Sequence, residues 1–168
     1  MRGTQGRGLK GRLGTVNGRN SVEILNAVLR RLYRSMLQYV HECWPWTHRG
    51  DGTAYPTVLK LREEELEDAK RLAELIVARG GAVATGSYPT EFVDTHFLAL
   101  DYLLDELVRA ERRRMEATEA DLARLGGDAE AAGLLREILR RELEHLGVLQ
   151  RLAGEHRYPE HALSRVEG

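Results

Sequence analysis

Apolar residues recur at intervals of three and four along four long segments of the chain, approximately 21–44, 56–79, 91–125 and 129–153. An α-helix turns once in about 3.6 residues, so this spacing places the apolar residues on one face of each helix. We find no convincing alternation with the period of two that a β-strand requires. Four helices with one apolar face each bury those faces best against one another. The pattern therefore predicts an all-α fold, an antiparallel four-helix bundle.

Local signals set the ends of these predicted helices. Asn20, with Glu23 three residues later, has the spacing of a capping box at the start of the first helix. The pair Gly80-Gly81 is typical of a helix C-terminus, and Gly126-Gly127 ends the third predicted helix in the same way. Asp128 stands where it can cap the first turn of the fourth helix.

The two ends of the chain differ in composition from the predicted bundle. Residues 1–20 contain six glycines and five basic residues but no acidic one, which predicts a flexible basic arm. Such an arm either contacts nucleic acid through its charges or is a leader without such a role. Residues 21–154 form the predicted bundle. Residues 155–168 are an extension, in which Pro159 could open a short fifth helix.

Composition narrows the classes of partner and compartment. The net charge is -1, so the chain as a whole shows no bias towards nucleic acid or membrane surfaces. No apolar run is long enough to span a bilayer, so we expect no membrane partner. Cys43 is the only cysteine, so the chain cannot form an intrachain disulfide. A chain without disulfides is expected most simply in a reducing cytoplasm.

Some ionisable side chains fall where the helical period calls for apolar ones. A lone buried carboxylate costs several kcal/mol, so such groups are normally paired or bound to a metal ion. In two cases the members of a pair are three residues apart, which puts both on one helix face. The alternative is that the apolar faces of some helices are shifted by one position. The ionisable residues would then lie at the rim of the bundle and form ion pairs with Arg136, Arg140 or Arg141. The residues concerned are Glu65, Asp68, Glu111, Glu142 and His145.

Counting from the predicted turn at Gly126 places these residues at matching levels. Glu111 precedes the turn by about as many residues as Glu142 follows it, so the two face each other in an antiparallel hairpin. Glu106 competes for the same role, but it lies about 7.5 Å further along the axis and off the apolar stripe. Glu111 is therefore the preferred core residue.

These residues resemble the ferritin-like superfamily, particularly its bacterioferritin and rubrerythrin-like members, over residues 20–153. Leu25-Asn26 and Gln38-Tyr39 look like the bacterioferritin pattern in the first helix, and Glu142-Leu143-Glu144-His145 looks like the fourth-helix motif. Glu65-Leu66-Glu67-Asp68 looks like the second-helix motif with Asp in place of His. Glu111 matches the third-helix glutamate.

The resemblance implies a carboxylate-rich site for iron, or for another hard divalent ion such as manganese. Glu111 would bridge two metal ions, Glu65 and Glu142 would be terminal ligands, and Asp68 and His145 would complete the shell. The implied function is iron handling or oxidation of iron(II). A homo-oligomer is also implied, because relatives associate through the outer faces of the first two helices.

Two departures make the implied di-iron site incomplete. Leu32 stands where the family has a metal-ligating glutamate in the first helix, and Asp68 replaces a histidine. We therefore expect any ferroxidase activity to be impaired. We expect no haem, since Leu66 stands where bacterioferritins have the haem-ligating methionine. The alternative function is a non-catalytic ferritin-like bundle with a structural or oligomerisation role.

Overall fold

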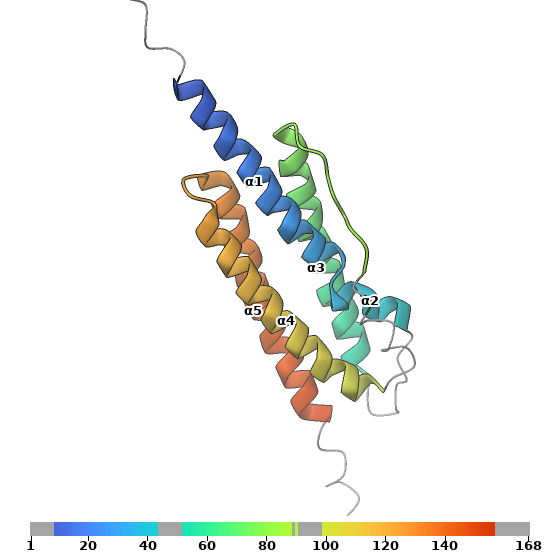
Figure 1. The fold of residues 1–168 in the computed structure, drawn as a ribbon. Helices are drawn as coiled ribbons and strands as arrows, with labels where there is room; N and C mark the ends of the chain where they lie inside the picture. Colours follow the sequence, from blue (N-terminus) through green and yellow to red (C-terminus); the bar gives the residue numbers. More distant parts are fainter. Residues whose placement is uncertain (1–8, 44–51, 89, 91–98, 157–168) are drawn as a thin grey trace, which may run out of the picture.

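The computed structural model describes residues 9–43, 52–88, 90 and 99–156, with the backbone alone for residues 9–19 and at 42, 43 and 156. Within this part of the chain every regular element is a helix, which confirms the all-α prediction (Figure 1). None of these helices is long and apolar enough to cross a membrane. The helices are α1 (Leu9–Tyr33), α2 (Met36–Cys43), α3 (Ala54–Ala78), α4 (Leu100–Arg124) and α5 (Ala129–His156).

The helices pack as two antiparallel pairs. Figure 1 shows α1 beside α3 and α4 beside α5, with the short helix α2 following α1 after a bend in the chain. Residues 81–88 form no regular element and run back along α1 after α3 ends. Asn26 of α1 fixes this segment: its Nδ2 donates to the carbonyl oxygen of Ala82 at 3.0 Å, and its Oδ1 accepts from the Ala84 amide at 2.9 Å.

The interior consists of two apolar clusters with a polar layer between them. The cluster around α2 contains Leu61 of α3 and Leu149 of α5, and the cluster nearer the α4–α5 turn contains Ala69 of α3 and Ile138 of α5. On α3 the residues between these positions that are buried are polar, and on α5 two of the three are. The buried polar residues of this layer are Ser35, Gln38, Glu65, Asp68, Glu111, Arg114, Thr118, Glu142 and His145.

The predicted helix ends are largely confirmed. Gly80 has a φ of 71°, a left-handed conformation that glycine adopts without steric cost, and the Gly81 amide donates to the Ile76 carbonyl at 2.9 Å. Asp128 caps α5, since its Oδ1 accepts from the Ala131 amide at 3.1 Å. The same carboxylate also pairs with Arg79, which ties the end of α3 to the start of α5.

Two predicted boundaries are wrong. The first helix begins at Leu9 rather than near residue 21, so it includes residues 9–20, where composition predicts a flexible arm. Extending a formed helix is far less costly than nucleating one, so scattered glycines do not stop it. The predicted helix over residues 21–44 is instead divided at Arg34-Ser35.

Three predictions concern residues outside the described part of the chain. The proposed fifth helix and most of the C-terminal extension fall in residues 157–168, which the structure does not describe. The first eight residues of the predicted arm are also outside the described part. Nucleic-acid contact by residues 1–20 therefore stays a prediction.

Candidate functional site

All five residues singled out from the sequence are buried. Their side chains are between 1% and 3% exposed, although four are carboxylates and one is an imidazole. Glu106, by contrast, is partly exposed and pairs with Arg109 on its own helix. The choice of Glu111 over Glu106 as the core glutamate is therefore confirmed. The five residues are Glu65, Asp68, Glu111, Glu142 and His145.

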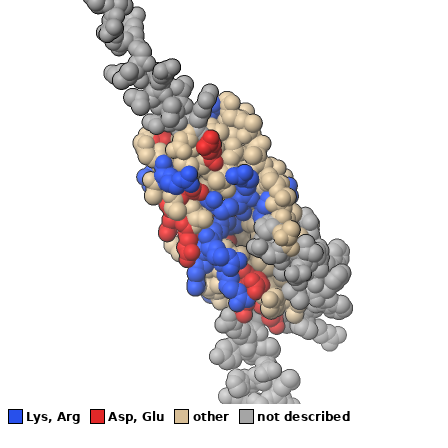
Figure 2. Space-filling model, viewed as in Figure 1, with Lys and Arg blue, Asp and Glu red and all other residues tan. Residues whose placement is uncertain are grey.

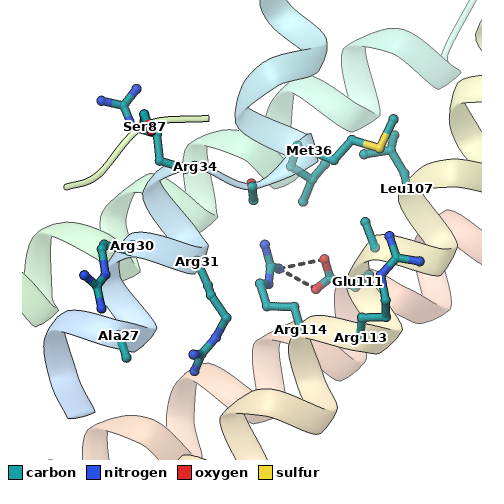
Figure 3. A pocket seen from close by; sticks show the side chains of 13 residues that line it. Ala27, Arg30, Arg31, Arg34, Met36, Ser87, Leu107, Glu111, Arg113 and Arg114 are labelled. Carbon is teal, nitrogen blue, oxygen red and sulfur yellow. Dashed lines mark hydrogen bonds and ion pairs between the residues drawn. The ribbon is translucent and has the colours of Figure 1, made fainter. Parts of the chain in front are cut away.

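Arg114 lies at the centre of three of these carboxylates. Its Nη2 is 2.6 Å from both carboxylate oxygens of Glu111 (Figure 3). Its Nε is 3.0 Å from Oε1 of Glu142. Its Nη1 forms an ion pair with Glu65. The side chain is 7% exposed, so the guanidinium is a buried charge shared by three helices. One arginine thus occupies the space among Glu65, Glu111 and Glu142.

Arg114 is not among the residues that the helical period singles out, although the sequence carries one signal for it. Arg114 follows Glu111 by three residues, so both lie on the same face of α4. Arginines on helices usually extend their charged ends to solvent, and the spacing does not show whether this one turns inward.

Glu65 is held from a second side by the break between α1 and α2. The Ser35 hydroxyl donates to Glu65 Oε2 at 2.6 Å, and Nε2 of Gln38 donates to the same oxygen at 2.9 Å. The Ser35 Oγ also accepts from the Gln38 amide at 3.2 Å, in the manner of a helix N-cap. The helix therefore breaks where its polar side chains reach a buried carboxylate.

Asp68 pairs away from this group. Its Oδ1 is 2.8 Å from Nη1 of Arg141 on α5 and 3.5 Å from Nη1 of Arg71 on α3. Burial raises the pKa of this carboxyl, while both guanidiniums act to lower it. Arg141 is one of the arginines expected as a partner if Asp68 lay at the rim, but Asp68 is buried, so the partner agrees with that alternative and the rim position does not.

His145 also has a partner of its own. Its Nε2 is 3.0 Å from Oε2 of Glu64, which lies beside Glu65 on α3. Burial lowers the pKa of the imidazole, and the hydrogen bond with Glu64 opposes that shift. The other ring nitrogen, Nδ1, is buried and has no hydrogen-bond partner in the described part of the chain.

The charges around Arg114 do not balance. Three carboxylates face one guanidinium, whose single positive charge can balance only one of them if all three are ionised. Burial accordingly raises the pKa of Glu111 well above its usual range, and the charge of Glu142 adds to that rise. Burial also raises the pKa of Glu142, although Arg114 opposes it. The remaining negative charge must be neutralised by protonation of a carboxyl or by a bound cation.

Two donor atoms in the polar layer are left without partners among the described residues. Oε2 of Glu142 and Nδ1 of His145 are both buried without a hydrogen-bond partner in the described part of the chain, three residues apart on α5. Leu32, at the position of the expected first-helix ligand, is 1% exposed and packs in the apolar cluster nearer the α4–α5 turn. As arranged, the described residues include no group of three or more His, Cys, Asp or Glu side chains placed to hold a metal.

The fold and the polar layer define a class of protein: an antiparallel helical bundle with carboxylates and a histidine buried at mid-height, as in ferritin-like proteins. A family model described as the ferritin-like domain matches residues 22–157, and the chain belongs to this family. No curated protein and no solved structure gave a significant match to the chain.

Proposed function

We propose that this ferritin-like protein binds a single hard divalent metal ion, iron or manganese, and that Arg114 takes the place of the second cation of a di-iron site. One observation carries the proposal. Glu142 and His145 form a Glu-x-x-His pair whose Oε2 and Nδ1 atoms are buried and lack hydrogen-bond partners among the described residues. Unpartnered buried polar atoms are costly, and a bound cation is one way to satisfy them.

The residues around this pair support the proposal. Glu64 holds Nε2 of His145, which fixes the tautomer that leaves Nδ1 without a proton and able to bind a cation. A third ligand would come from Glu111 or Glu65, after its carboxylate shifts from Arg114. The resident metal would supply Lewis-acid or one-electron chemistry. Glu111, whose pKa is raised, would give up its proton as the cation enters.

Elemental analysis together with titration calorimetry of metal-free protein with Mn²⁺ tests this proposal. We expect about one ion per chain at saturation, with proton release on binding. Glu142→Ala should abolish binding, whereas Glu144→Ala should not, because Glu144 is exposed on the same helix and, among the described residues, pairs with Arg140 alone. The proposal fails if no ion binds, if two bind, or if both variants lose binding equally.

A second candidate function is a non-catalytic bundle in which Arg114 makes the metal ion unnecessary. Its support is the contact of one guanidinium with three carboxylates, together with the lack of a three-ligand group in the described chain. In that case divalent ions would leave the melting temperature unchanged. Under the first proposal, saturating Mn²⁺ raises the melting temperature, because it binds only the folded chain.

We further propose that the chain assembles as a homo-oligomer through the outer faces of α1 and α3. Tyr33 and Leu66 are both 38% exposed there, and with Val83 they line a hollow of about 370 Å³. Exposed apolar side chains gathered around one hollow are typical of a protein contact surface. Ferritin-like relatives associate through the corresponding helix faces, and the resemblance implies the same contact in this chain.

A further inference from the structure

A cavity of about 410 Å³ opens between α1, α4 and the segment at Ser87. Five arginines line it, and Figure 3 shows side chains from α1 and from α4 around it. In the space-filling view, lysines and arginines form a continuous band over this face of the molecule (Figure 2). The arginines of the cavity are Arg30, Arg31, Arg34, Arg113 and Arg114.

Two of the five charges are already balanced within the protein. Arg114 is held by the buried carboxylates, and Arg31 pairs with Asp121 at 2.5 Å. Arg31 nevertheless keeps one unused donor, since its Nε is buried and has no hydrogen-bond partner in the described part of the chain.

The other three arginines lack an acidic partner within the described residues. Arg34 donates from Nε to the carbonyl oxygens of Thr85 and Gly86, at 3.3 and 3.1 Å, and these carbonyls carry no charge. Arg30 and Arg113 are exposed, and neither forms an ion pair in the described part of the chain. The cavity therefore has an excess of positive charge from opposite walls, Arg30 on α1 and Arg113 on α4.

Apart from Ser35, Ser87 and Glu111, whose carboxylate is paired with Arg114, the remaining wall of the cavity is apolar. Met36, Leu37 and Leu107 line it, together with the small side chains of Ala27 and Ala110. Small-molecule sites are concave, mostly apolar, and about 300–1,000 Å³ in volume, with a few polar groups that orient the ligand. A surface that bound only the nucleic-acid backbone would need the arginines but not an apolar recess.

We propose that this cavity binds a small organic anion, a phosphate or carboxylate group carried on an apolar body. The charges of Arg30 and Arg113, unpaired among the described residues, attract the anionic group, which accepts from Nε of Arg31, while the apolar body contacts Met36 and Leu107. Guanidinium groups bind both anions through paired N–H donors, so the chemistry is shared by the two ligand classes. The inference goes beyond the proposed metal site and does not rest on it.

Titration calorimetry of metal-free protein tests the proposal with three probes of similar size. Phenyl phosphate and phenylacetate are the two anionic probes, and benzyl alcohol is the neutral one. We expect saturable binding of one molecule per chain for at least one anion, and none for the alcohol. Whichever anion binds more tightly identifies the ligand class. Absence of saturable anion binding, or equal binding of benzyl alcohol, would overturn the proposal.

Matched variants show whether binding occurs in this cavity. The double variant Arg30→Gln/Arg113→Gln should weaken anion binding about tenfold or more, because it removes two charged donors. Arg112→Gln should leave affinity nearly unchanged, since Arg112 is exposed on α4 but does not line the cavity. Ala27→Phe should block binding without changing any charge, with folding checked by circular dichroism.

Two outcomes of the variant series would also contradict the proposal. Equal weakening by Arg112→Gln and by the double variant would mean that general surface charge attracts the anion. If Arg30→Gln/Arg113→Gln abolished binding of duplex DNA while the small anions bound wild-type protein no better than the alcohol, the arginine band would be a nucleic-acid surface instead.

Discussion

Arg114 and Glu111 lie one turn apart on α4, and Nη2 of the guanidinium is 2.6 Å from both oxygens of the carboxylate. The same guanidinium reaches Glu142 on α5 and Glu65 on α3. Each of these carboxylates gains a charge-assisted hydrogen bond or ion pair, so one side chain links three helices through the polar layer. The mid-height of the bundle is thus held by a buried ion cluster rather than by apolar packing.

Replacing Arg114 should lower the stability of the metal-free chain while leaving its ability to bind a metal ion. Arg114→Gln leaves three buried carboxylates without a counter-charge, so we expect the free energy of unfolding of metal-free protein to fall by about 3–5 kcal/mol. Adding Mn²⁺ should restore much of this loss. Urea denaturation with and without Mn²⁺ measures both effects. Arg112→Gln, an exposed neighbour, should change stability by less than about 0.5 kcal/mol; a comparable loss in that control would argue against a role for the buried cluster.

A second metal ion should bind only when two residues change together. Leu32→Glu alone places another carboxylate in an apolar cluster and should destabilise the chain. In the double variant Leu32→Glu/Arg114→Gln, the missing first-helix ligand is supplied and the competing guanidinium is removed. We expect elemental analysis to find about two ions per chain in the double variant and about one in the wild type. An unchanged ratio would mean that Leu32 does not occupy the missing ligand position.

The Arg79–Asp128 ion pair should make stability depend on pH in the acid range. The hydrogen bonds that Asp128 accepts from Arg79 lower the pKa of Asp128 from 3.8 to about 2 in the folded chain. A lowered folded-state pKa means that the contribution is complete above about pH 4 and is lost as the pH falls through about 2. Allowing for solvent screening, the contribution is about 1–2 kcal/mol.

Asp128→Asn should therefore reduce stability at pH 6, and the difference from wild type should shrink between pH 4 and pH 2. Denaturant titrations at several pH values measure this difference. Glu130→Gln is the matched control, because Glu130 also pairs with Arg79 but its side chain is 74% exposed. The control should differ little from wild type across the range; a constant deficit for Asp128→Asn would show that charge is not the cause.

Assembly should depend on the exposed apolar residues of α1 and α3. Leu66→Arg places a charge beside the hollow lined by Tyr33 and Val83, where it would have to be desolvated in a subunit contact. Sedimentation velocity at micromolar concentration should show the wild type as a dimer or larger and this variant as a smaller species. Leu143→Arg, on the outer face of α5 and 58% exposed in the wild type, should leave assembly intact. A monomeric wild type would refute the assembly proposal.

The sequence by itself determined that the chain is helical and which positions on the helices are buried, but not where the first helix begins or breaks. Period and local end signals decided them: Glu65, Glu111 and Glu142 fall on apolar faces by residue count alone, and all three are buried. The turn at Gly126 also aligned Glu111 with Glu142, because a tight turn fixes the levels of an antiparallel hairpin. The sequence also placed Asp128 at the cap of α5, since capping acts within one turn.

Only the tertiary structure decided which partners the buried groups take. The period places Arg114 on the face of Glu111, but the guanidinium turns inward because carboxylates from α3 and α5 surround it. The helix break at Ser35 has the same cause, since the Ser35 hydroxyl reaches Glu65 on another helix. Long side chains have many rotamers, and the lowest in free energy depends on charges brought together from distant parts of the chain, which no local pattern records.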